Sequence, residues 1–183
     1  MQRRTTSAGF SLIEILLVLI VLVLAQSLAM PVLSDVLNAR RLSSSTDAIY
    51  DSLILARSEA AKRNSRVVVC KSESGNACSA NGSWQQGWIV FHDVNHNGIL
   101  DANEFVVRRE SALPTNVRAA GNGPVSTYVA YTPYGKTVLV SGAFQAGTVT
   151  VCSQSTSKGT AQQIVINSSG RPRIAKVAIN QCA

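Results

Sequence analysis

The sequence has few of the residues from which enzyme active sites are usually built. Its 183 residues include only two histidines, His92 and His96, and no glycine-rich loop that would cradle a phosphate. No serine lies in the strand-turn-helix context that exposes a nucleophile. We therefore expect no enzymatic activity. A metal-dependent hydrolase built on His92, Asp93 and Asp101 is the alternative.

Charged residues are scarce, at 15% of the chain, and acidic residues are nearly missing from its second half. Residues 1–104 contain nine basic and nine acidic residues, whereas residues 105–183 contain eight basic residues and the single acid Glu110. The formal net charge is +7. Because the excess is concentrated in one half, that half is suited to a negatively charged partner.

Long apolar runs are also absent, with the exception of residues 10–30 (FSLIEILLVLIVLVLAQSLAM). This run is long enough to cross a hydrocarbon core of about 30 Å as a helix. Arg3 and Arg4 precede it without an acid, which predicts a cytoplasmic N-terminus and places everything after Pro31 across the membrane. A cleaved secretory signal is the alternative, but the run is too long and no clean cleavage site follows. The charge of Glu14 inside the run requires a partner.

The junction Gly9-Phe10-Ser11-Leu12-Ile13-Glu14 resembles the class III leader of type IV pilins and type II secretion pseudopilins. The resemblance implies that residues 1–9 are a prepilin leader, that a prepilin peptidase cuts between Gly9 and Phe10, and that Phe10 is then methylated. It also implies that Glu14, the fifth mature residue, pairs with the N-terminal amine of an adjacent subunit during assembly. Pro31 falls where that family often has a proline that kinks the helix.

A second helical pattern follows over residues 31–64. Between Val32 and Asn64 there is no glycine or proline, and apolar residues recur with helical spacing, which predicts an amphipathic helix with one core face. That face consists of Leu42, Ile49, Leu53, Ala56 and Ala60. Glu59 and Arg63 are spaced as an i,i+4 ion pair.

After Asn64 the pattern becomes extended, with short β-branched runs separated by turn residues. The predicted strands cover residues 66–71, 84–92, 105–109, 127–132, 137–140, 148–153, 162–167 and 174–179. A long helix followed by short strands predicts an α+β protein in which residues 65–183 form an antiparallel β-sheet domain packed on the helix. This is also the type IV pilin-like fold that the resemblance implies.

Three later segments extend the resemblance to minor pilins of the GspH/FimT type. They are WQQGWIVF, the Asp- and Asn-rich loop after it, and GRPR. The resemblance implies a single-pass inner-membrane protein with a periplasmic C-terminal domain, assembled into an extracellular pilus or a periplasmic pseudopilus. Its implied partners are other pilins or pseudopilins, the prepilin peptidase and the inner-membrane assembly platform.

All four cysteines follow the predicted span: Cys70, Cys78, Cys152 and Cys182. An even number in an oxidising compartment indicates disulfides. Three pairings are open, and we favour Cys70 with Cys78 and Cys152 with Cys182. A zinc site is the rival interpretation, although the spacings fit no common ligand pattern.

The loop DVNHNGILDANE, residues 93–104, fits the twelve-residue calcium-loop pattern. Its candidate ligands are Asp93, Asn95, Asn97, Ile99, Asp101 and Glu104. Strands rather than helices flank the loop, and three carboxylates predict weak calcium binding. The alternative is a turn at Asn97-Gly98 with solvated acids.

The segment NSSGRPRIAK, residues 167–176, carries the functional prediction. Gly170 lies in a turn, and Arg171, Arg173 and Lys176 follow it. Since residues two apart in an extended chain leave on one side, the two arginines suit successive phosphates of double-stranded DNA. Gly170-Arg171-Pro172-Arg173 resembles the GRxR motif of minor pilins that bind DNA in natural transformation. The alternative is a structural minor pilin or pseudopilin that primes assembly of a type IV pilus or a type II secretion pseudopilus, with the basic hairpin solvated or paired to acids of a neighbouring pilin.

Overall fold

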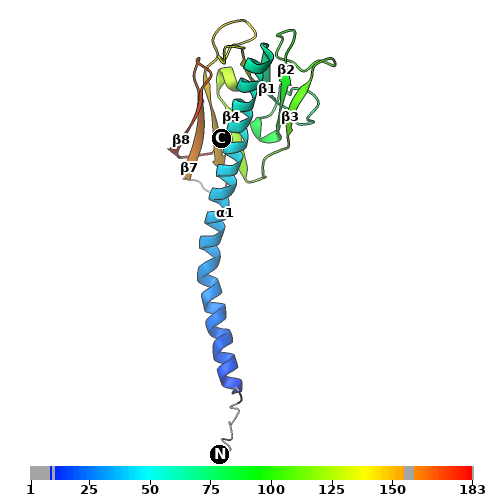
Figure 1. Ribbon diagram of the computed structural model, residues 1–183. Helices are drawn as coiled ribbons and strands as arrows, with labels where there is room; N and C mark the ends of the chain where they lie inside the picture. The colour runs from blue at the N-terminus through cyan, green and yellow to red at the C-terminus, as the bar shows by residue number, and fades with distance from the viewer. Residues whose placement is uncertain (1–8, 10, 155–158, 183) are drawn as a thin grey trace, which may run out of the picture. The chain divides into compact units, whose positions relative to one another are not determined.

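The computed structural model describes residues 9, 11–154 and 159–182, without the side chains of residues 25–32, 159 and 160. The chain divides into two units, Met1–Ala39 and Arg40–Ala183. In chain order (Figure 1) the elements are α1 (Leu12–Arg63), β1 (Val67–Lys71), η1 (Trp84–Gln86), β2 (Trp88–His92), β3 (Val106–Glu110), β4 (Val117–Gly121), η2 (Gly123–Val125), β5 (Tyr128–Tyr131), β6 (Gly147–Ser153), β7 (Gly159–Ile166) and β8 (Pro172–Ile179).

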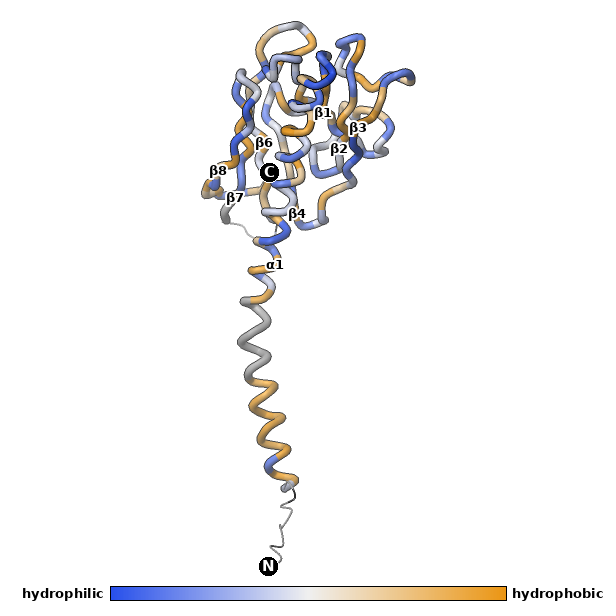
Figure 2. Tube along the Cα trace, in the orientation of Figure 1, coloured by the Kyte–Doolittle hydropathy of each residue, from blue (hydrophilic) through white to orange (hydrophobic). Residues whose placement is uncertain are grey.

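The first unit contains the N-terminal part of α1. From Leu12 to Leu24 its large apolar side chains are all exposed. Figure 2 shows this stretch as mostly apolar, and its one charged residue is Glu14. Within the described residues, no helix reaches the length and hydropathy needed to cross a membrane. Phe10 and the side chains of residues 25–30, which belong to the predicted span, lie outside the description.

In the second unit, α1 buries one face. The predicted core residues of the helix are all buried and belong to one apolar cluster with both sheets, which confirms the amphipathic pattern. Ser52 also lies on this face, where its hydroxyl accepts a 2.9 Å hydrogen bond from the indole of Trp88. The predicted pair of Glu59 and Arg63 is present at 2.6 Å. Hydrogen bonding to Arg63 holds the pKa of Glu59 below its usual value.

The strands form two four-stranded antiparallel sheets, ordered β3-β2-β1-β5 and β4-β6-β7-β8. Figure 1 shows β7 and β8 on one side of the helix and β1, β2 and β3 on the other. Both sheets contribute to the cluster around α1, for example through Val90 of β2 and Ile164 of β7. The antiparallel α+β architecture is as predicted, although the single expected sheet is divided into two.

Several strand predictions need correction. Residues 137–140 are not a strand, and only Thr137 and Val138 form isolated bridges, to Tyr131 and Phe144. Residues 84–86 are a 3₁₀ turn, because Gly87 turns the chain at φ 106° and the Trp84 indole donates to the carbonyl oxygen of Val125. Strand β4 (VRAAG) was not predicted, because its small side chains have no apolar alternation, and it becomes a strand by pairing with β6.

The structure contains two disulfides. Cys70 is bonded to Cys78 and Cys152 to Cys182, the pairing favoured from the sequence. The first lies against the outer face of the β1–β2 sheet, where Val68, Ile89 and Phe91 form a second apolar cluster. The second ties the segment after β8 back to β6.

Candidate nucleic-acid interface

The turn between β7 and β8, residues 167–171, is built around Asn167 and Gly170. The Asn167 side-chain oxygen accepts hydrogen bonds from the Ser169 hydroxyl at 2.7 Å and from the backbone N–H of Arg171 at 3.2 Å. The N–H of Gly170 donates to the Asn167 carbonyl oxygen at 2.9 Å. These hydrogen bonds fix the backbone conformation of the turn from which Arg171 and Arg173 follow.

Gly170 is required at this position for two reasons. Its φ is +74°, a conformation that L side chains rarely adopt, and a Cβ here would overlap the carbonyl oxygen of Gly135. The β7–β8 turn therefore packs backbone to backbone against the turn at residues 132–136. Arg57 of α1 also contacts the turn at residues 132–136, because its Nε donates to the Gly135 carbonyl oxygen at 3.1 Å.

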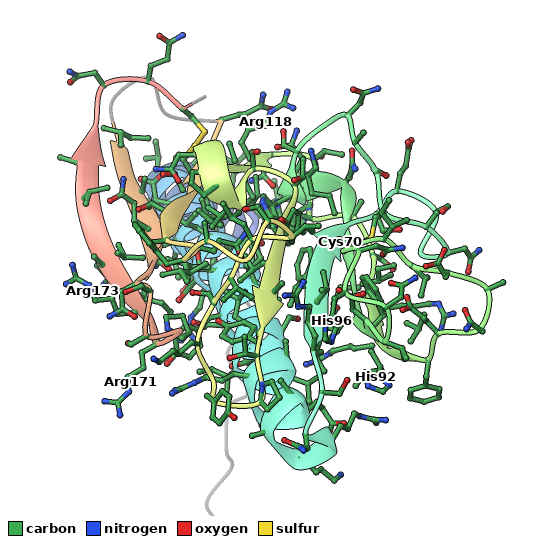
Figure 3. All side chains as sticks on the ribbon, turned by 90° about the horizontal axis from the view of Figure 1, so that it is seen from above. Cys70, His92, His96, Arg118, Arg171 and Arg173 are labelled. Carbon is green, nitrogen blue, oxygen red and sulfur yellow. A yellow bond between two sulfur atoms is a disulfide. The ribbon has the colours of Figure 1, made fainter. Side chains whose placement is uncertain are left out.

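Arg171 and Arg173 are both exposed, while Pro172 between them is buried. Figure 3 shows the two guanidinium groups extending away from the body of the domain on the same side. The predicted arrangement of the arginine pair is therefore compatible with the structure.

Lys176 lies on another face of β8 from Arg173, and its part in DNA binding stays a prediction. Arg173 is opposite Val165 and Lys176 is opposite Gln162, so the alternation of β8 places them on opposite faces of the sheet. Gln162 shares its face with the buried core residue Ile164. Lys176 is exposed on that inner side, at the edge strand.

Among the other basic residues of the second half that the structure describes, Lys136 lies beside the turn. It is exposed and lines a hollow of about 460 Å³ together with Ser168 and Ser169. Arg118 lies away from Arg171 and Arg173 in Figure 3 and donates to the Gln154 side chain.

The other basic residues of the second half lie on β3 or outside the described residues. On β3, the Nε of Arg108 lies 2.7 Å from Glu110, and the Nε of Arg109 donates to the Gly75 carbonyl oxygen at 2.9 Å. Lys158 lies outside the described residues. Within the part of the chain that the structure describes, the basic residues placed around the turn are Arg171, Arg173, Lys136 and the half-buried Arg57.

The loop of residues 93–104 forms a hydrogen-bonded network. Asp93 is buried, and its carboxylate accepts from the N–H groups of Asn97 and Gly98, both at 3.1 Å. Burial is the largest influence and raises the pKa of Asp93 above its usual value, while the Gly98 N–H opposes that shift. Glu104 accepts from the N–H groups of Val94 and Asp101.

Within this network the side-chain amides of Asn95 and Asn97 both donate to the carboxylate of Asp101, at 2.8 Å. No group of three acidic, histidine or cysteine side chains suited to a metal occurs among the described residues. Calcium binding at this loop stays a prediction, which calorimetry at millimolar calcium would test.

Comparison with known proteins decides the family. The family model described as type II transport protein GspH matches residues 45–170, which is more than half of the chain. This chain belongs to the GspH family. No curated protein sequence is similar enough to count as a match.

Solved structures show the fold of this GspH-family protein. Two crystal forms of the type IV minor pilin FimU from Pseudomonas aeruginosa are similar, with TM-scores of 0.59 and 0.56 and identities of 17% and 18%. They cover 79% and 78% of this chain and 97% and 100% of theirs. The minor pseudopilin EpsH of the Vibrio cholerae type 2 secretion system has a TM-score of 0.48 and 9% identity, covering 75% of this chain and 97% of its own. The predicted type IV pilin-like fold is confirmed.

The N-terminal residues predicted for processing and assembly are partly described. Gly9 is exposed and precedes the helix, and Phe10 lies outside the described residues. Glu14 is exposed in the first turn of α1, where its N–H donates to the Ser11 carbonyl oxygen at 3.0 Å. Cleavage, methylation and the role of Glu14 stay predictions.

Two residues near the β7–β8 turn, Arg57 and Tyr134, were not among the predicted site residues. Arg57 was assigned only to the helix, and Tyr134 to the connection between two strands. The sequence contains one signal for Tyr134, because Pro-Tyr-Gly (residues 133–135) is a turn tip where an aromatic ring has little chance of burial. Nothing local indicates that either residue lies near Arg171.

Proposed function

We propose that this GspH-family protein is a minor pilin that binds double-stranded DNA without sequence specificity through the β7–β8 turn, for DNA uptake in natural transformation. The observation that carries the proposal is the pair of exposed arginines, Arg171 and Arg173, after a turn that is closed by hydrogen bonds to Asn167. A guanidinium group presents its N–H donors in a planar fork, which suits bidentate contacts with phosphate oxygens.

The charges around the turn favour the same partner. Arg57 and Lys136 add positive charge, and the single acid of residues 105–183, Glu110, lies on β3 beside Arg108. A turn of this kind contacts backbone phosphates and reads no bases, so its affinity should depend on salt and not on sequence.

The test is duplex DNA binding of the full chain in a nonionic detergent, measured by fluorescence anisotropy across a salt series. Arg171→Gln/Arg173→Gln should weaken binding strongly and reduce the slope of log affinity against log salt by about 1.8, for two lost phosphate contacts. Arg108→Gln/Arg109→Gln removes the same charge from β3 and serves as the matched control.

Two results would contradict the DNA proposal. One is a wild-type chain that binds no duplex even at low salt. The other is an equal loss of affinity in both double variants, because that would indicate net charge and not the turn.

The second candidate function is a structural minor pilin or pseudopilin that primes assembly of a type IV pilus or a type II secretion pseudopilus. The exposed apolar side chains of α1 from Leu12 to Leu24 favour it, since a contiguous apolar surface requires lipid or neighbouring helices. Deleting the gene and scoring transformation, twitching and secretion separately distinguishes the two functions.

We also propose the maturation and location that accompany either function. Prepilin peptidase cuts after Gly9 and Phe10 is methylated, while residues 10–30 hold the subunit in the inner membrane with Arg40–Ala183 in the periplasm. The same apolar residues then pack with other pilins or pseudopilins in the filament. Mass spectrometry of the N-terminus of the purified chain tests the cleavage.

A further inference from the structure

Tyr134 is exposed to an unusual degree for an aromatic side chain. It lies at the tip of the turn formed by residues 132–136, with 87% of its surface exposed. Two backbone hydrogen bonds close that turn, from the N–H of Gly135 to the Thr132 carbonyl oxygen and from the N–H of Thr132 to the Lys136 carbonyl oxygen, both at 2.9 Å. The ring is therefore presented by a rigid turn.

The turn that carries Tyr134 is in direct contact with the turn that carries Arg171. No room for a Cβ exists between Gly170 and the Gly135 carbonyl oxygen. The residue after Gly170 is Arg171 and the residue before Gly135 is Tyr134. A molecule bound by the arginines is consequently within reach of the tyrosine ring.

A hollow of about 380 Å³ lies beside the ring, between the tip and α1. The residues that line it include Tyr134, Pro133, Ile54, Ala61, Ser58 and Arg57. The guanidinium of Arg57 lies against Gly135, to which its Nε is hydrogen-bonded. Among the described residues, no acidic side chain lines this hollow.

We propose that this hollow binds an unpaired nucleobase of the DNA that the arginines hold. The inference rests on the proposed function. Aromatic rings and guanidinium planes are protein groups on which bases stack, and the positive charge of Arg57 suits the attached phosphates. Bases inside a duplex are already stacked and paired, so the hollow takes a base from a single-stranded tail or a frayed end.

The test compares two labelled DNAs with the full chain in a nonionic detergent: a blunt duplex, and the same duplex with a short single-stranded tail. The wild type should bind the tailed duplex about tenfold more tightly, as expected for one stacked base. Tyr134→Ala should remove this preference and leave blunt-duplex affinity unchanged. Tyr134→Phe should retain the preference, because the ring is kept.

Phe105→Ala is the matched control, since Phe105 is also an exposed aromatic residue, at 60%, but stacks near Arg63 on another segment. It should retain the preference. Equal affinity of the wild type for both DNAs, or a preference that survives in Tyr134→Ala, overturns the inference while the proposed function stands. If neither DNA binds, the proposed function and the inference both fail.

A protein partner would give a different result. If Tyr134 is protected from iodination when a second pilin subunit is added without DNA, the hollow is a subunit contact and the inference is overturned. Protection by the tailed DNA and by neither the blunt duplex nor a second subunit supports it.

Discussion

Gly170 has the most constrained environment of the residues around the basic turn. Both its positive φ and the closeness of the Gly135 carbonyl oxygen exclude a side chain. Gly142 has a similar φ, +87°, but no atom lies within 4 Å of the position its Cβ would take. Substitution of Gly142 therefore tests backbone strain alone, whereas substitution of Gly170 tests backbone strain together with steric overlap.

Gly170→Ala should lower the free energy of unfolding by about 2 to 3 kcal/mol, because strain and overlap act together. Gly142→Ala should cost about 1 kcal/mol, from the left-handed backbone alone. Urea unfolding of residues 40–183 measures both. Equal costs would contradict the close contact between the two turns.

Asp93 supplies a prediction of pH dependence. Its pKa is raised by burial, so the folded protein holds the proton more tightly than the unfolded chain, in which the pKa is about 3.9. The contribution of Asp93 to stability is therefore complete below about pH 4 and is lost as pH rises through the raised pKa.

Urea unfolding of wild type and Asp93→Asn, with a chelator present, tests this prediction. The variant has no titrating carboxyl group at position 93, so the advantage of the wild type over it should shrink as the pH rises above about 4. Two parallel stability curves would contradict the raised pKa.

At the scale of elements, the β7–β8 hairpin is held by its pairing with β6 and by the disulfide Cys152–Cys182. This disulfide closes a sequence separation of 30 that contains the whole hairpin, whereas Cys70–Cys78 closes a separation of only 8. The two bonds therefore differ in how much they restrict the unfolded chain and in what they hold in place.

Replacing Cys152 and Cys182 with serine should cost about 3.5 kcal/mol, against about 2.5 kcal/mol for Cys70 and Cys78, if loop entropy dominates. The first replacement should also weaken DNA binding, because β8 carries Arg173. Thermal unfolding and anisotropy measure the two effects. Equal DNA affinity in both variants would show that the turn does not depend on this disulfide.

At the scale of the whole molecule, the chain has a basic half and an apolar N-terminal helix that carries one acid. Glu14 is exposed in the first turn of α1, among apolar side chains that are also exposed. A carboxylate in apolar surroundings is costly without a partner, and the amine of a neighbouring mature subunit would supply one.

Glu14→Val should leave the fold of residues 40–183 unchanged and strongly reduce incorporation into filaments, as measured by immunoblotting of sheared filaments. Glu14→Asp, which keeps the charge, should retain part of it. Normal incorporation of the valine variant would exclude the predicted pairing.

The sequence by itself determined the features that depend on neighbours along the chain. The period of Leu42, Ile49, Leu53, Ala56 and Ala60 predicted the buried face of α1, and the short separation of Cys70 from Cys78 favoured their pairing, which the structure contains. Helical period and short separations are local properties, so they can be read without the fold.

Tertiary structure decided what depends on register and on contacts between distant segments. The pairing of β8 with β7 placed Lys176 on the face opposite Arg173, and the pairing with β6 made a strand of the featureless VRAAG segment. The contact between Gly170 and Gly135, 35 residues apart, brought Tyr134 beside Arg171. Such proximity arises from long-range packing, which no local pattern encodes.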